Sequence, residues 1–180
     1  MPNQKLTVHS NNKPMVALRA PRKEDGSEVW KLVSECPPLD QNSMYMNVVQ
    51  CDHFAKTCVL AERDGQVLGW VSGHIPPDAS DTIFVWQVAV HDDARGLGLG
   101  KRMLRALLDR AVCARVSKLE TTITKSNAAS WGLFKSFARD MGGELSDTPH
   151  YTREDHLDGR HATEHLVTIS LPRKRLRSVA

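Results

Sequence analysis

Apolar, β-branched runs alternate along the chain with stretches whose apolar residues recur at helical spacing. The β-branched runs predict strands over residues 15–20, 57–62, 67–74, 81–90, 118–124 and 164–171. The helical stretches predict helices from 25–27 to 36, from 42–43 to 49, over 98–113 and over 127–141. Helices and strands in this order, with a final strand or strand pair, are typical of a domain of mixed structure, α/β or α+β.

Turn and capping residues mark the ends of these elements. Asp25 or Ser27 is predicted to cap the first helix. Pro37-Pro38 is predicted to end it, because proline has no amide hydrogen and restricts the residue before it. Residues 63–66, Arg-Asp-Gly-Gln, predict a hairpin turn between two strands.

The length of 180 residues suits one domain, predicted to span residues 15–171. The polar segment at 1–14 is expected to be flexible, and the basic tail at 172–180 is expected to be disordered. Hydrophobic residues make up 41% of the chain and charged residues 25%, as in ordinary soluble proteins. The cysteines form no C-x-x-C pair and are expected to be buried, reduced thiols: Cys36, Cys51, Cys58 and Cys113.

The formal net charge of +3 belongs to the tail rather than to the domain. Without Arg173, Lys174, Arg175 and Arg177, the 24 basic residues fall to 20, against 21 acidic residues. A nearly neutral domain argues against a nucleic-acid partner. No run approaches the roughly 18 apolar residues of a membrane span, and the polar start does not resemble a secretory signal. We therefore expect a cytoplasmic protein without membrane contact.

A glycine-rich segment, residues 95–100 with the sequence Arg-Gly-Leu-Gly-Leu-Gly, separates the strand at 81–90 from the helix at 98–113. Amides at a helix N-terminus have no partner within the helix, and the helix dipole favours negative charge there. Glycine lets the backbone approach a bulky phosphate because it carries no Cβ. The segment therefore predicts a pyrophosphate site.

The glycine spacing excludes two common phosphate-binding motifs. A G-x-G-x-x-G dinucleotide fingerprint would need its third glycine one residue later. A P-loop would need Ser or Thr after Lys101, where the chain has Arg102. Instead, Arg95-x-x-Gly98-x-Gly100 is similar to the Q/R-x-x-G-x-G/A motif of the GCN5-related N-acetyltransferase (GNAT) family, which wraps the pyrophosphate of acetyl-CoA.

The family's second motif, Asn-x-x-Ala-x-x-Leu-Tyr, is matched at residues 127–134, Asn-Ala-Ala-Ser-Trp-Gly-Leu-Phe. This resemblance implies the GNAT fold, a mixed and splayed central β-sheet flanked by helices. It also implies that acetyl-CoA enters between the strand ending near Val90 and the strand ending near Thr124. By the same resemblance, cofactor contacts are expected from the backbone of Val88 and Val90, and from Arg95, Gly96, Gly98, Gly100, Lys101 and Asn127.

A closer resemblance covers almost the whole chain. Residues 37–43, 81–90 and 119–124 look like the corresponding blocks of the L-2,4-diaminobutyrate acetyltransferases. This resemblance implies transfer of the acetyl group of acetyl-CoA to the 4-amino group of L-2,4-diaminobutyrate. The product belongs to the biosynthesis of ectoine, a compatible solute made under osmotic stress. It also implies a homodimer.

The reaction requires a neutral amine as nucleophile. An alkylammonium has a pKa of about 10.4, so the site must accept a proton directly or through water. We expect the pair His161 and Glu164 to do this, with Asp40 holding the α-ammonium of the substrate. Strict strand alternation would place His161 and Glu164 on opposite faces, so they share a site only if His161 precedes the strand or a bulge intervenes.

Other candidates are weighed against ordinary structural roles. Phe134 stands where the family has the tyrosine that acts as general acid. Tyr45 is therefore predicted to replace it as the acid or to bind the substrate. The alternative is that Tyr45 is only a half-buried tyrosine on a helix. Trp86 is predicted to line the substrate pocket, although it also suits a core. Glu120 is a further candidate base or substrate ligand, or only a strand-edge residue.

Residues 161–165 match the zinc motif H-x-x-E-H, but that motif needs a helix and the sequence predicts a strand, so no metal is expected. Two other functions remain open at this point. In the first, the acetyl group goes to another small amine or to a polyamine. In the second, the chain binds acetyl-CoA without turnover, which the phenylalanine in the second motif favours.

Overall fold

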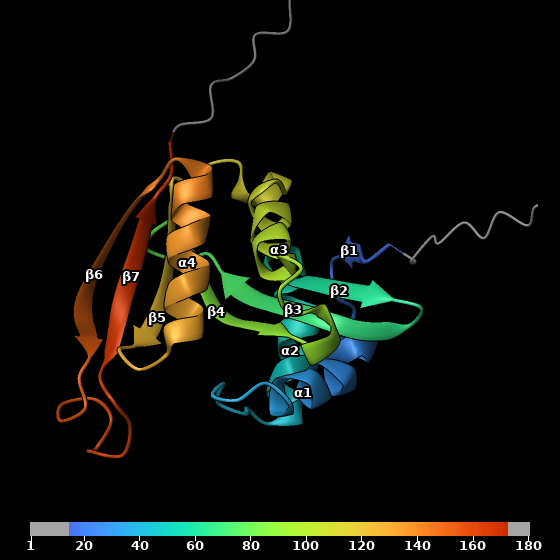
Figure 1. The fold of residues 1–180 in the computed structure, drawn as a ribbon, viewed down its shortest axis with the longest axis horizontal. Helices are drawn as coiled ribbons and strands as arrows, with labels where there is room; N and C mark the ends of the chain where they lie inside the picture. The colour runs from blue at the N-terminus through green and yellow to red at the C-terminus, as the bar shows by residue number, and fades with distance from the viewer. Residues whose placement is uncertain (1–14, 173–180) are drawn as a thin grey trace, which may run out of the picture.

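Residues 15–172 are described by the computed structural model. Within them a mixed sheet has the strand order β1-β2-β3-β4-β5-β7-β6, with helices on both faces (Figure 1). The strands are β1 (Ala17–Arg19), β2 (Val59–Arg63), β3 (Gln66–His74), β4 (Thr82–Val90), β5 (Lys118–Thr124), β6 (Glu144–Tyr151) and β7 (Glu164–Ser170). The helices are α1 (Gly26–Ser34), α2 (Met44–His53), α3 (Leu99–Leu108) and α4 (Ala128–Met141), with short 3-10 turns at Lys23–Asp25, Ala55–Thr57, Asp92–Ala94 and Ala111–Cys113.

Alternation along the central strands gives the sheet two buried faces. On β2, Val59 and Ala61 belong to the large core beneath α3 and α4, whereas Leu60 belongs to the smaller core beneath α1 and α2. Trp70 of β3 is fully buried in the smaller core. All four cysteines are buried, and none forms a disulfide among residues 15–172, as predicted.

The sheet splays between β4 and β5. These strands are parallel and pair only over Thr82–Phe84 and Lys118–Glu120, near the start of each strand. Beyond these residues β4 continues to Val90 beside β3, and β5 continues to Thr124 beside β7. A gap therefore opens between the carboxyl ends of two parallel strands, which confirms the predicted mixed, splayed sheet.

A β-bulge on β4 shifts its alternation. Ser72 of β3 opposes Gln87, and the next residue, Gly73, opposes Val85, so Trp86 is the extra residue on β4. Residues three positions apart in a regular strand face opposite sides of the sheet. Val85 and Val88 nevertheless both pack toward the large core. The bulge thus turns Val88 and Val90 toward α3 and α4.

Predicted and observed elements differ mainly in three places. The helix predicted to end at residue 49 continues to His53 as α2. The helix predicted over 98–113 ends at Leu108, because Arg110 is extended (φ −73°, ψ 149°) and donates to the carbonyls of Ala55, Lys56 and Cys58. The strand β6 formed in a region where only a possible strand pair was expected, and it pairs with β7 along its length. The predicted flexible segment 1–14 and most of the predicted tail, 173–180, lie outside the described residues.

No helix among residues 15–172 combines the length and apolar character needed to cross a membrane.

Candidate active site

The glycine-rich turn forms one wall of a cavity at the N-terminus of α3. Gly98 is the N-cap of this helix and adopts a left-handed conformation (φ 70°, ψ 15°), which a residue with a Cβ rarely adopts. A Cβ added at Gly96 or Gly98 would meet no atom within 4 Å, so the turn borders open space. The cavity measures about 650 Å³ and is lined by Val88, Val90, Arg95, Gly96, Gly98, Gly100, Lys101 and Asn127, all predicted cofactor residues, among others.

Backbone groups of β4 face the gap in the sheet. The N–H of His91 donates to the carbonyl of Leu68 at 2.9 Å, immediately beyond the opposed pair Val90 and Gly69. In an antiparallel ladder this arrangement turns the N–H and C=O of Val90 away from β3. Val88 lies two residues earlier with no bulge in between, so its N–H and C=O also point away from β3. Because no described strand pairs with β4 here, the N–H of Val88 is available to a ligand in the gap.

The basic side chains of this cavity already have acidic partners. The Nζ of Lys101 lies 2.7 Å from Oδ2 of Asp140 and 3.1 Å from Oγ of Ser136, so it links α3 to α4. The hydrogen bond from Lys101 lowers the pKa of Asp140. Arg95 pairs with Asp92 at 2.7 Å, and its Nε donates to the carbonyl of Val90 at 3.2 Å. A diphosphate in the cavity would share these cations with the carboxylates.

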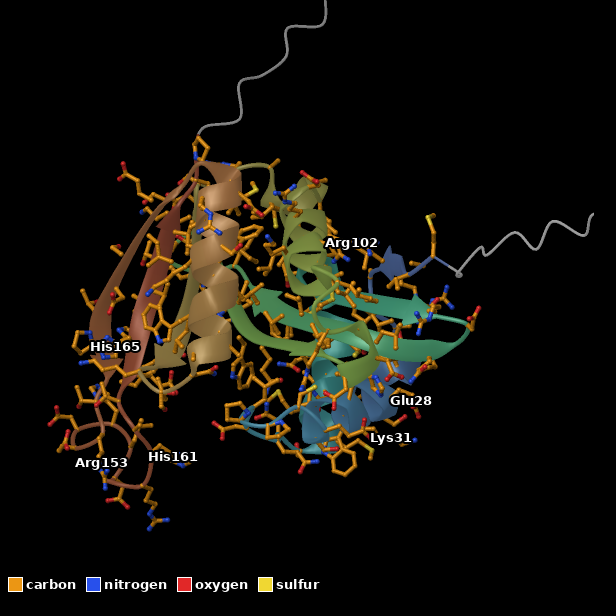
Figure 2. All side chains as sticks on the ribbon, viewed as in Figure 1. Glu28, Lys31, Arg102, Arg153, His161 and His165 are labelled. Carbon is orange, nitrogen blue, oxygen red and sulfur yellow. The ribbon has the colours of Figure 1, made fainter. Side chains whose placement is uncertain are left out.

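A second cavity, of about 690 Å³, adjoins the first. It brings together Asp40, Trp86, His161 and Glu164, which the sequence predicted as a group. His161 lies on the loop that precedes β7, and His165 lies within the strand (Figure 2). Both cavities are lined by Pro38, Leu39, Val88, Asn127 and Ser130.

Glu164 is partly buried at the first position of β7. Burial raises the pKa of its carboxyl, and the nearby Asp40 carboxylate raises it further. His165 and His161 act in the opposite direction. A carboxyl with a raised pKa is a stronger base once ionised, which suits proton removal from an ammonium group.

Asp40 is held in place by a residue that the sequence did not single out. The Nε2 of Gln87 donates to the main-chain carbonyl of Asp40 at 2.8 Å. Gln87 is 4% exposed and lines the second cavity. No periodicity or motif distinguishes a glutamine within an apolar strand, so only the tertiary contact shows its position.

Two other predicted residues lie outside the cavities. Tyr45 on α2 is 77% exposed and is not among the lining residues of either cavity, whereas Tyr151 at the end of β6 lines the second one. Glu120 of β5 accepts a hydrogen bond from Thr168 Oγ1 at 3.3 Å and lines neither cavity. Phe134, which replaces the family's tyrosine, is buried and lines the second cavity.

The H-x-x-E-H match lies on a loop and a strand rather than on a helix. Its last histidine, His165, is bound through Nδ1 to Oδ2 of Asp147 at 2.9 Å. Among residues 15–172 no group of three or more histidine, cysteine, aspartate or glutamate residues is arranged to hold a metal ion.

A glycine-lined cavity at a helix N-terminus thus meets a carboxylate-bearing cavity where β4 no longer pairs with β5. The sequence profile of the acetyltransferase (GNAT) family matches residues 27–138, and the chain belongs to this family. It is therefore an acetyltransferase, and acetyl-CoA is its acetyl donor.

Within the family, the chain is similar to proteins named L-2,4-diaminobutyric acid acetyltransferase. The protein from Methylotuvimicrobium alcaliphilum is 44% identical over 87% of this chain and 91% of its own length. The protein from Vibrio cholerae is 43% identical over 91% of this chain and 94% of its own.

A solved structure is similar over nearly the same range. Diaminobutyrate acetyltransferase EctA from Paenibacillus lautus, in complex with L-2,4-diaminobutyric acid and coenzyme A, superposes with a TM-score of 0.83. It is 36% identical, and the match covers 88% of this chain and 96% of that one.

Proposed function

We propose that this enzyme transfers the acetyl group of acetyl-CoA to the 4-amino group of L-2,4-diaminobutyrate, giving N4-acetyl-L-2,4-diaminobutyrate and CoA. The observation that carries the proposal is the junction of the two cavities at Val88. One cavity ends at amides suited to a diphosphate, and the other holds two carboxylates suited to a diamine. The relatives named for this activity support the choice of acceptor.

Glu164, with His161 beside it, accepts the proton from the 4-ammonium of the substrate, directly or through water. The neutral amine then attacks the thioester carbonyl, and the N–H of Val88 donates to the oxygen that becomes negative. The carbon–sulfur bond breaks as the carbonyl re-forms, and the second proton leaves the nitrogen. The thiolate of CoA carries away the electron pair.

Asp40 binds the α-ammonium in the second cavity, and Trp86 forms part of the wall of this cavity. Recognition of a second ammonium would separate this substrate from simple monoamines. Arg95, Gly96, Gly98, Gly100 and Lys101 bind the diphosphate of acetyl-CoA, and Asn127 and Val90 border its pantetheine arm.

A tyrosine that protonates the departing thiolate would assist the reaction without being essential, because a thiol has a pKa of about 8.5. Tyr45 remains the tyrosine predicted from the sequence, and the position of Tyr151 in the second cavity supports it as the other candidate. Replacing each by Phe decides between them: the acid is the one whose loss lowers kcat and removes the alkaline limb of the pH profile of kcat.

The remaining proposals rest on the resemblance to the diaminobutyrate acetyltransferases. We place the activity in ectoine biosynthesis under osmotic stress, in the cytoplasm, and assign it to residues 15–171 acting as a homodimer. Light scattering of the purified protein tests the dimer, and a chain limited to residues 15–171 tests the domain.

The direct test is to incubate the purified chain with acetyl-CoA and L-2,4-diaminobutyrate, follow thiol release, and locate the acetyl group by mass spectrometry. Thiol release with acetylation at N4 is expected. Brisk release with a polyamine and none with diaminobutyrate would contradict the acceptor. Saturable acetyl-CoA binding without release would instead favour a module without turnover, the second candidate that Phe134 suggests.

A further inference from the structure

The Gln87 side chain lies between β4 and the loop that carries Asp40. Its Nε2 donates to the Asp40 main-chain carbonyl at 2.8 Å. A carbonyl oxygen can only accept a hydrogen bond, so the nitrogen of the amide must face it and Oε1 must point elsewhere. The contact therefore fixes both ends of the Gln87 amide.

Oε1 of Gln87 is buried and accepts no hydrogen bond within residues 15–172. Buried acceptors in native proteins nearly always have a partner, so this atom calls for a donor that the described chain does not supply. Ser72, directly opposite on β3, is 1% exposed and also leaves its Oγ without a partner. Gln87 lines the second cavity, whereas Ser72 does not.

The acidic character of the cavity indicates what the missing donor is. Asp40 and Glu164 are close enough for one carboxylate to raise the pKa of the other, and no lysine or arginine is among the lining residues. A cavity with this charge attracts ammonium groups. An ammonium carries three N–H donors, so the Asp40 carboxylate alone leaves donors free for a neutral acceptor.

We propose that Gln87 determines specificity for the α-ammonium of the substrate: Oε1 accepts one of its N–H groups, while Nε2 holds the main chain of Asp40 so that its carboxylate takes another. The inference rests on the proposed function and adds a substrate contact to it. A carbonyl acceptor held beside Asp40 favours amines that carry a second ammonium over amines that lack one.

The test compares Gln87→Met, which removes both polar ends of the side chain, with Gln87→Glu, which keeps an acceptor but loses the donor to Asp40. Q87M is expected to raise KM for diaminobutyrate by about 10–100-fold, as for a lost hydrogen bond to a charged group, with KM for acetyl-CoA unchanged. Q87E is expected to recover most of that loss. The inhibition constant of 4-aminobutyrate, which lacks the α-ammonium, is expected to be the same in wild type and Q87M.

Ser72→Ala is the matched control, since it removes a buried, unpartnered oxygen from the neighbouring strand outside the cavity. It is expected to leave both KM values unchanged. Equal rises in KM for diaminobutyrate in Q87M and Q87E would show that Gln87 only holds the loop. A rise in S72A equal to that in Q87M would indicate a buried water that bridges Ser72 Oγ and Gln87 Oε1. Either result overturns the inference.

Coenzyme A affinity and thermal unfolding of each variant report whether it is folded. A wild-type chain that does not acetylate diaminobutyrate contradicts the proposed function. An active wild type with KM for diaminobutyrate unchanged in Q87M contradicts this inference alone.

Discussion

Glu164 lies where β7 begins, and His161 lies on the loop before it, so the two side chains line one cavity without belonging to one strand face. Strict alternation would have separated them, and the sequence alone could not decide where the strand starts. The grouping with Asp40 and Trp86 was predictable because their blocks resemble a known family. The position of Gln87 was not, because it depends on one contact between a strand and a distant loop.

At this scale we predict that Glu164→Gln lowers kcat by about 10²–10⁴-fold, the usual contribution of a general base. Glutamine keeps the size of the side chain but cannot take a proton from the substrate ammonium. The acetyl-CoA dissociation constant, measured by calorimetry, is expected to stay within error of wild type, because Glu164 does not line the first cavity. His161→Ala is expected to follow the same pattern. Parallel losses in binding and turnover would instead identify both as packing residues.

The pH profile provides a second prediction. Glu164 acts as a base only when ionised, and its pKa is raised first by burial and then by Asp40, against the opposite effect of His165 and His161. Asp40→Asn removes the like charge, so the pKa of Glu164 falls, while burial still acts to raise it. The acidic limb of kcat/KM is therefore expected to move to lower pH, while the magnitude of kcat/KM falls as the α-ammonium loses its partner. An acidic limb at the wild-type pH would contradict this coupling.

At the scale of elements, periodicity predicted the central strands and the helices α1, α3 and α4, because each presents an apolar face to one of the two cores. The helix α2 was also predicted, although the residues it buries are Asn47, Gln50 and Cys51. It did not predict β6 firmly, since nearly every residue of that strand is exposed and Pro149 interrupts it. The end of α3 was also misplaced: apolar spacing continues to Cys113, but contacts of Arg110 with residues 55–58 draw the chain out of the helix.

The N-terminus of α3 gives the third prediction. Gly98→Ala forces a residue with a Cβ to φ 70°, at a cost of about 1–2 kcal/mol, and places a methyl group in the open space of the turn. We expect weaker acetyl-CoA binding in titration calorimetry before any loss of kcat at saturation.

Gly132→Ala is the matched control, because Gly132 lies within α4 with open space around it. It is expected to leave acetyl-CoA binding unchanged and to raise stability by about 0.5–1 kcal/mol through helix propensity. Equal binding by the Gly98 variant and wild type would show that the turn does not contact the cofactor.

For the whole molecule, the sheet consists of two parts, β1–β4 and β5–β7, joined through the three register pairs of β4 with β5. The order of elements made this mixed topology predictable through the resemblance to the family. The extent of the splay was not predictable, because it depends on how few residues of two parallel strands pair.

A ligand that fills the gap should stabilise both parts together, which is the fourth prediction. At a CoA concentration of 100 times Kd, binding adds about 2.7 kcal/mol to the free energy of unfolding, or roughly 5–10 °C in Tm for a chain of this size. Differential scanning calorimetry with and without CoA measures this shift. A Tm that does not change at millimolar CoA would show that the folded chain does not bind CoA in this concentration range.

Because of the extra residue at Trp86, the side to which each later residue of β4 points depends on the number of residues in this strand. Every side chain after it in β4 faces the opposite side from the one it would occupy in a regular strand. A deletion of one residue there would send Val88 and Val90 toward α1 and α2 and turn Gln87 to the other side. The number of residues in β4, as much as their chemistry, thus decides on which side of the sheet the acetyl donor meets the amine that accepts the acetyl group.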